Sequence, residues 1–382
     1  MKLLLLFFFW SLWYINFSTR TILSPLLPLI EDELSIDYGL AGSIFAFMSV
    51  GYTASLLLSG ALSSRIGYKR SMAVGLTVLS LSLFGLHYAP GYKSLAVTCL
   101  FIGLGAGVYL PCVIPLLTAA FDRNHWGKVI AFHDTAASLS ILSVPLLVVF
   151  GLQFLQWRSL FSVLGIATLL GLLCFFILSP DVPLAERNST GLLCIIRRRD
   201  FWIMSILWIF AAACTLGIYN MIPLFLVKGN QIPLQTANTI LGLSRTGGFV
   251  AVMLAGFLAD KFGVKKVLFS VLLITGLSTA ALAFAPPFAP LITILIIQAT
   301  VSPAFFPVAL AAISRMTGFT ERSTFTGATS AVGAVFGLGL TPAALGAIAD
   351  VWNFNVGFLL FGLLTCLSCL LLKGISWGEV SA

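Results

Sequence analysis

The sequence predicts an all-α membrane protein with twelve transmembrane helices, built as two six-helix bundles related by a pseudo-twofold axis. The mean hydropathy is +1.06 and only 9% of the residues are charged, whereas soluble chains carry roughly 25%. Apolar runs of about 20 residues, the length that crosses a bilayer core, recur along the whole chain of 382 residues. The chain also repeats a motif at a fixed offset, which indicates a duplicated unit.

Short polar loops and Gly/Pro turns separate the expected spans. We expect bundles at residues 1–180 and 201–382, joined by a polar linker at 181–200. The apolar N-terminus resembles a signal peptide but has no small-residue cleavage site, so it is expected to form the first half of the first span. The expected spans are 6–30, 38–61, 70–89, 95–121, 127–151, 157–179, 202–227, 235–258, 266–285, 290–315, 325–349 and 355–373.

Basic residues are distributed unevenly between the two sets of loops. Counted along these spans, sixteen of the 21 Lys and Arg residues fall on one side. This asymmetry follows the positive-inside rule and predicts a multi-pass protein of a cell membrane, the inner membrane in a bacterium, with both termini cytoplasmic. Because the net charge of +8 is spread over loops rather than gathered in a patch, we expect no nucleic-acid partner.

The repeated motif is a basic loop between two apolar runs. It reads GALSSRIGYKR at 60–70 and GFLADKFGVKK at 256–266, an offset of 196 residues that also relates Pro111 to Pro307. Here the chain resembles the major facilitator superfamily, whose signature loop follows the second helix of each half. The resemblance covers the whole chain and implies a transporter that works by alternating access.

The motif departs from the family in its first copy, which has Ser64 where the second keeps Asp260. In the family this carboxylate helps latch the cytoplasmic side. The resemblance therefore implies a latch formed by Arg65, Arg70, Asp260 and Arg315. The helix 4 arginine of many proton-coupled drug exporters would fall at Cys99, and its absence favours uptake over efflux.

Charged residues inside a span are costly and mark functional sites. Arg20 and Arg245 lie deep in their spans, and arginine binds carboxylate or phosphate through two parallel hydrogen bonds. Both are predicted to bind an anion; the alternative is a structural role against backbone carbonyls. Asp134 is predicted to carry a coupling proton, to act as a gate or to be structural, and His133 to handle protons or simply to be hydrogen-bonded.

Further candidates lie on the spans that, by the resemblance, line or flank a central cavity. Asn16 is one turn from Arg20, and the region around both looks like the helix 1 arginine region of organic-anion carriers. The polar or aromatic candidates for substrate contact on other spans are Tyr109, Tyr219 and Gln298.

The sequence therefore predicts a secondary active transporter of a small organic anion, a carboxylate, coupled to protons by symport. The alternative is an anion exchanger or efflux carrier of the same superfamily. We expect a monomer in the lipid bilayer whose partners are the anionic substrate and the proton. A metal cluster, a nucleophile–base pair and a soluble domain are not evident, so we expect no enzyme activity, metal or cofactor.

Overall fold

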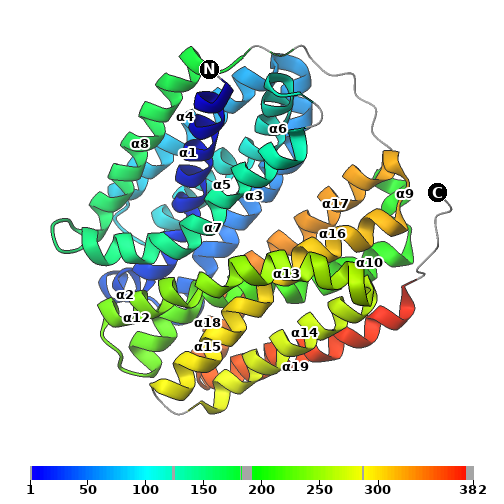
Figure 1. Cartoon of the computed structure of the whole chain (residues 1–382). Helices are drawn as coiled ribbons and strands as arrows, with labels where there is room; N and C mark the ends of the chain where they lie inside the picture. Colours follow the sequence, from blue (N-terminus) through cyan, green and yellow to red (C-terminus); the bar gives the residue numbers. More distant parts are fainter. Residues whose placement is uncertain (1, 123–124, 181, 183–191, 286–287, 376–382) are drawn as a thin grey trace. The chain divides into compact units, whose positions relative to one another are not determined.

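The computed structural model describes residues 2–122, 125–180, 182, 192–285 and 288–375 (Figure 1). Twelve helical segments within these ranges are long and apolar enough to cross a membrane. They confirm the predicted fold class, and their ends lie within a few residues of those expected. Residues 181 and 183–191 of the expected linker lie outside the described ranges.

The chain divides into two compact units. Unit 1 comprises Met1–Ile36 and Ser43–Arg187, and unit 2 comprises Asp37–Gly42 and Asn188–Ala382. A single long helix, α3, therefore contributes its first residues to unit 2 and the rest to unit 1.

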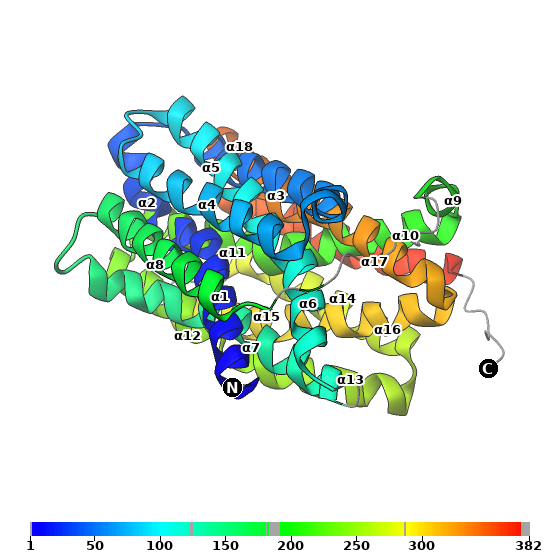
Figure 2. The ribbon, with the colours of Figure 1, turned by 90° about the horizontal axis from the view of Figure 1, so that it is seen from above.

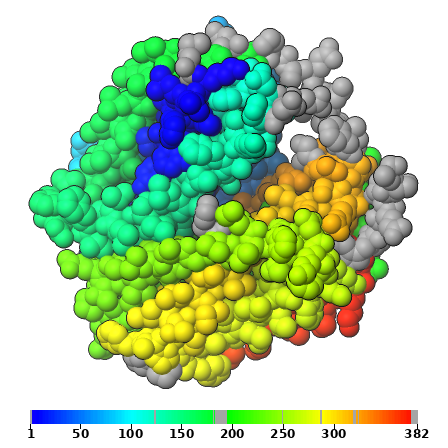
Figure 3. Space-filling view, viewed as in Figure 1, coloured from blue at the N-terminus to red at the C-terminus, as the bar shows by residue number. Residues whose placement is uncertain are grey.

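Unit 1 contains the first six spans, and α1 with α2 forms the first of them. The helix α4 packs between α5 and α8, and α1 packs along α7. Figure 2 shows α8, α4 and α5 side by side, and Figure 3 shows α1 (dark blue) next to α7 (turquoise) on one face. The helices are α1 Lys2–Thr21, α2 Leu23–Leu34, α3 Tyr38–Ile66, α4 Tyr68–His87, α5 Tyr92–Gly107, α6 Tyr109–Ala120, α7 Trp126–Gly151 and α8 Trp157–Leu178.

Unit 2 contains the other six spans, several of which include π-helical or 3₁₀ turns. The α-helices are α9 Leu192–Ile196, α10 Arg199–Ala212, α11 Ile218–Leu224, α12 Leu234–Ser244, α13 Thr246–Phe262, α14 Val264–Ala281, α15 Ala289–Val301, α16 Phe305–Met316, α17 Phe319–Gly333, α18 Thr341–Val351 and α19 Phe354–Ser368. The other turns are η2 Ala213–Gly217, η3 Phe225–Gly229, η4 Leu282–Phe284, η5 Ser302–Ala304, η6 Ala334–Leu340 and η7 Cys369–Gly374.

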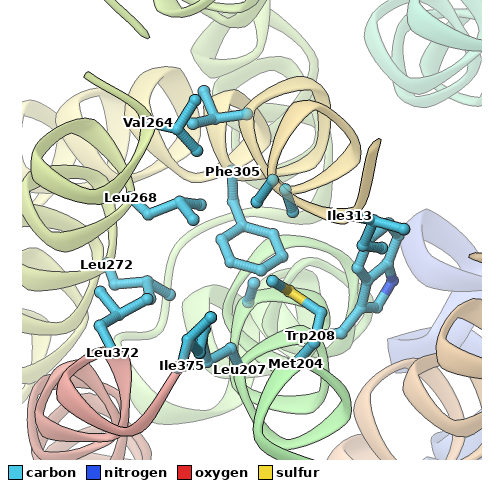
Figure 4. Close-up of a cluster of buried hydrophobic side chains, with 14 of the residues drawn as sticks. Met204, Leu207, Trp208, Val264, Leu268, Leu272, Phe305, Ile313, Leu372 and Ile375 are labelled. Carbon is cyan, nitrogen blue, oxygen red and sulfur yellow. The ribbon is translucent and has the colours of Figure 1, made fainter. Parts of the chain in front are cut away.

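The core of unit 2 is assembled from α10, α14, α16 and the end of the last span. Phe305 lies at its centre (Figure 4), with its ring edge-on to Trp208 at a centroid distance of 5.8 Å. Lipid tails are as apolar as these side chains, so the helices within each unit are held together by close packing rather than by removal of apolar surface from water.

In unit 1, glycine permits very close approach of neighbouring helices: a Cβ on Gly103 would lie 2.0 Å from the Met48 carbonyl oxygen.

Proline explains two of the breaks within spans. Proline has no N–H and clashes with the carbonyl four residues earlier, so it interrupts a helix at that point. The helix α1 ends at Thr21, four residues before Pro25, and α5 ends at Gly107, four residues before Pro111. The first and fourth spans therefore each consist of two helices, and Arg20 lies in the last turn before such a break.

The two copies of the repeated motif have the same backbone conformation. Gly67 lies between α3 and α4 and has φ 87° and ψ 159°. Gly263 lies between α13 and α14 and has φ 90° and ψ 140°. Only glycine adopts this region without strain. The sequence repeat therefore corresponds to a repeated helix–glycine–helix turn, one in each unit.

Candidate functional site

In unit 1, the guanidinium group of Arg20 is packed against aromatic rings. Its Cζ lies 4.4 Å from the ring centre of Phe17, 4.6 Å from that of Tyr52 and 5.6 Å from that of Trp13. Tyr52, on α3, also interacts with the guanidinium through its hydroxyl group. Cation–π contacts each contribute about 0.5–2 kcal/mol, so the rings stabilise the charge without neutralising it.

Trp13 connects Arg20 to a second buried cluster. Its indole stacks on Tyr109 at 5.1 Å and on His133 at 5.8 Å, with ring planes within 15° of parallel. The Tyr109 hydroxyl donates a hydrogen bond to the Phe9 carbonyl oxygen at 2.6 Å and lies 3.2 Å from His133 Nε2. Residues from α1, α6 and α7 are thereby fixed as one aromatic stack beside the arginine.

In unit 2, Arg245 lies at the break between α12 and α13. The hydroxyl groups of Ser244 and Thr246 donate to backbone carbonyls three residues earlier, which competes with regular helix formation. The guanidinium is 4.7 Å from the ring centre of Tyr219, and its Nη1 donates a long hydrogen bond of 3.4 Å to the carbonyl oxygen of Thr215 in the π-helical η2. Arg245 is 7% exposed and Tyr219 is fully buried.

The two arginines leave the same N–H groups unpaired. Nε and Nη2 of Arg20 and of Arg245 are buried and have no hydrogen-bond partner among the described residues. These two nitrogens form one edge of the guanidinium plane, the edge that binds both oxygens of a carboxylate or phosphate. A buried unpaired donor costs about 1–3 kcal/mol, so each unit holds a guanidinium edge that the described residues leave unsatisfied.

Asn16 and Gln298 are positioned by hydrogen bonds to backbone carbonyls. The Asn16 side-chain nitrogen donates to Ala106 O at 3.3 Å, and the Gln298 nitrogen donates to Cys214 O at 2.6 Å. Their side-chain oxygens remain buried without a partner among the described residues. These oxygens can only accept hydrogen bonds, so they suit a hydroxyl donor rather than a carboxylate.

The two neighbouring titratable residues of α7 face different ways. His133 is 1% exposed within the aromatic stack, whereas Asp134 lies on the exposed side of the helix. The Asp134 carboxyl group is nevertheless close enough to Trp13 to interact with it. The 100° step between neighbouring residues of a helix turns the two side chains apart, and the histidine is the one that packs inside. The roles of both residues stay predictions.

The expected latch residues make no ion pair in the described part of the chain. Arg65, Arg70, Asp260 and Arg315 are all exposed. In unit 2 the ion pairs that the structure describes are those of Arg198, with Glu321 at 2.9 Å and Asp200 at 3.9 Å. Arg198 also donates a hydrogen bond to the carbonyl oxygen of Met316. The role of the four latch residues stays a prediction.

The rings around Arg20 are the part of the site that sequence reasoning missed. Trp13 is seven residues before Arg20 and Phe17 three, which places both near its face of α1, and that spacing was available as a signal. Tyr52 comes from another helix and gave none. A group of three or more His, Cys, Asp or Glu side chains suited to a metal is not found in the described ranges.

Comparison with known proteins agrees with this architecture. The Major Facilitator Superfamily profile matches residues 9–250 and 222–377. The hexuronate transporter of Bacillus subtilis (strain 168) is 25% identical over 304 residues, covering 73% of this chain and 71% of that protein. The 3-(3-hydroxy-phenyl)propionate transporter of Escherichia coli (strain K12) is 26% identical over 266 residues, covering 66% and 64%.

Among solved structures, a D-xylose–proton symporter shares the fold with a TM-score of 0.80 at 16% identity, covering 100% of this chain and 99% of the other. The fold is thus that of a multi-pass membrane protein. The chain belongs to the Major Facilitator Superfamily.

Proposed function

We propose that the protein transports a small organic anion with a carboxylate group, and that Arg20 and Arg245 bind it. The observation that supports this most strongly is the buried, unpaired Nε/Nη2 edge on both arginines. A bound carboxylate would accept two charge-assisted hydrogen bonds from such an edge. It would also supply the negative charge that the rings around each guanidinium do not provide.

The substrate is proposed to carry hydroxyl groups as well. The free oxygens of Asn16 and Gln298 are acceptors, and a substrate hydroxyl would satisfy them as a donor. Two of the similar proteins are named for such compounds, a hexuronate and a hydroxyphenylpropionate. Both compounds are carboxylates with at least one hydroxyl group.

Transport is proposed to be symport with a proton carried by Asp134, across a cell membrane with both termini cytoplasmic. Asp134 supports this role because its carboxyl group interacts with Trp13, one of the rings around Arg20. A proton on Asp134 would lie next to the aromatic stack, and Trp13 of that stack contacts Arg20. Anion binding and proton binding would then occur in the same part of unit 1.

The experiment is a binding and counterflow screen on the purified protein. Hexuronate, galactonate and 3-(3-hydroxyphenyl)propionate would be compared with their uncharged amides and deoxy analogues, first by thermal shift and then by counterflow in liposomes. We expect at least one hydroxy acid to bind and exchange while its amide does neither, and Arg20→Ala and Arg245→Ala each to abolish exchange in folded protein. Normal counterflow by either variant would remove that arginine from the site.

A further inference from the structure

At the end of unit 2 where α10 begins and the last span ends, two basic residues line one apolar groove. Its volume is about 440 Å³, and its walls are Arg199, Ile203, Leu370, Leu371, Lys373 and Gly374. The guanidinium of Arg199 packs against Gly374, where a Cβ would lie 3.1 Å from Nη2. The absent side chain of Gly374 therefore leaves room for the cation beside the groove.

The basic residues of this groove have no acidic partner in the part of the chain that the structure describes. Of the three consecutive arginines at 197–199, Arg198 is paired with Glu321 and Asp200. Neither Arg199 nor Lys373 makes an ion pair with any described residue. The groove thus combines aliphatic walls with two cations that make no ion pair within the described ranges.

Unit 1 has a groove at the corresponding place, between the start of its first span and the end of its sixth. It is lined by Lys2, Leu4, Leu5, Ala120, Leu178 and Pro180, and its volume is about 400 Å³. Its single cation, Lys2, is 3.5 Å from the carboxylate of Asp122. The two grooves are similar in size and apolar character, but among the described residues the cation of the unit 1 groove is paired and those of the unit 2 groove are not.

We propose that the unit 2 groove binds an anionic phospholipid, with the phosphodiester between Arg199 and Lys373 and the acyl chains along Ile203, Leu370 and Leu371. Both basic residues lie at span ends, the depth at which lipid phosphates lie. A free phosphate would use the cations but not the aliphatic wall, so the groove fits a lipid better. This site is separate from the proposed substrate site and does not depend on it.

The test measures stepwise lipid binding to the purified full-length protein by native mass spectrometry. Phosphatidylglycerol and phosphatidylethanolamine with identical acyl chains are compared, with glycerol phosphate as competitor. Each basic residue near a membrane surface strengthens binding of an anionic lipid by about fivefold. Arg199→Gln or Lys373→Gln should each lower the preference for phosphatidylglycerol about fivefold, and the double variant should remove it.

The matched control is Arg197→Gln with Lys266→Gln, which changes the net charge equally at exposed positions outside the groove. We expect it to keep the preference, and Lys2→Gln to keep it as well. An equal loss in the control would show that general electrostatics attract the lipid and would overturn the site. Displacement by glycerol phosphate at matched concentration would also overturn it, in favour of a free-anion site. Thermal unfolding in neutral detergent confirms that each variant is folded.

Discussion

Exchanging each arginine for lysine separates the shape of the anion-binding group from its charge. In Arg20→Lys and Arg245→Lys the positive charge is kept, but the two parallel N–H groups of the Nε/Nη2 edge are replaced by one ammonium group. A hydrogen bond to a charged group contributes about 1.5–3 kcal/mol, and lysine can keep one of the two. We therefore expect each variant to bind the carboxylate substrate roughly 10- to 150-fold more weakly, since about 1.4 kcal/mol corresponds to tenfold.

Equilibrium binding to purified protein, by isothermal titration calorimetry or scintillation proximity, measures this loss. Arg197→Lys serves as the control because Arg197 is exposed and outside both arginine clusters. The double variant adds information: losses that add indicate separate substrate groups at the two arginines, and losses that do not add indicate a shared group. Binding within twofold of the native protein in both single variants would refute the idea that the unpaired edge recognises the anion.

Three further changes test other parts of the structure. Tyr109→Phe keeps the ring but removes the hydroxyl that bonds to Phe9 and His133. It should lower the free energy of unfolding by about 1–3 kcal/mol, measured by denaturant titration in detergent; an unchanged midpoint would contradict a stabilising role for these hydrogen bonds. Asp134→Asn should abolish uptake driven by a pH gradient but spare counterflow, and retained proton-driven uptake would exclude Asp134 as the proton carrier. Gly103→Ala brings a Cβ to 2.0 Å from a backbone oxygen and should destabilise unit 1, whereas Gly256→Ala meets no described atom within 4 Å and should leave thermal stability unchanged.

The spans could be predicted closely because membrane insertion depends on hydropathy and length, which are local properties of the sequence. The breaks within them were not predicted. The end of α1 at Thr21 follows from Pro25, but Pro145 lies within the continuous helix α7. Whether proline ends a helix depends on how neighbouring helices satisfy the freed backbone groups, and the sequence alone does not contain that information.

The two charged residues of the candidate site could be predicted from the sequence, but the side chains that pack around them could not. Arg20 and Arg245 stand out because few ionisable residues lie inside the spans. The stack of Trp13 with Tyr109 and His133 joins three helices, and such contacts depend on helix rotation and depth. For the same reason, helical spacing showed that His133 and Asp134 point in different directions but did not show which of them is buried.

The arginine geometry did not come from the duplication that produced the two units. The offset of 196 residues relates Arg20 to Leu216 and Arg245 to Ser49, so neither arginine has a counterpart in the other half. Their surroundings also differ: three rings pack against Arg20, whereas Tyr219 and the Thr215 carbonyl hold Arg245. Both nevertheless lie at helix breaks and leave the same two nitrogens unpaired. A purely structural arginine would be expected to use all of its buried donors, because each unpaired donor reduces stability. The same costly arrangement at two unrelated positions is the observation that supports the proposal of an anionic ligand for each arginine.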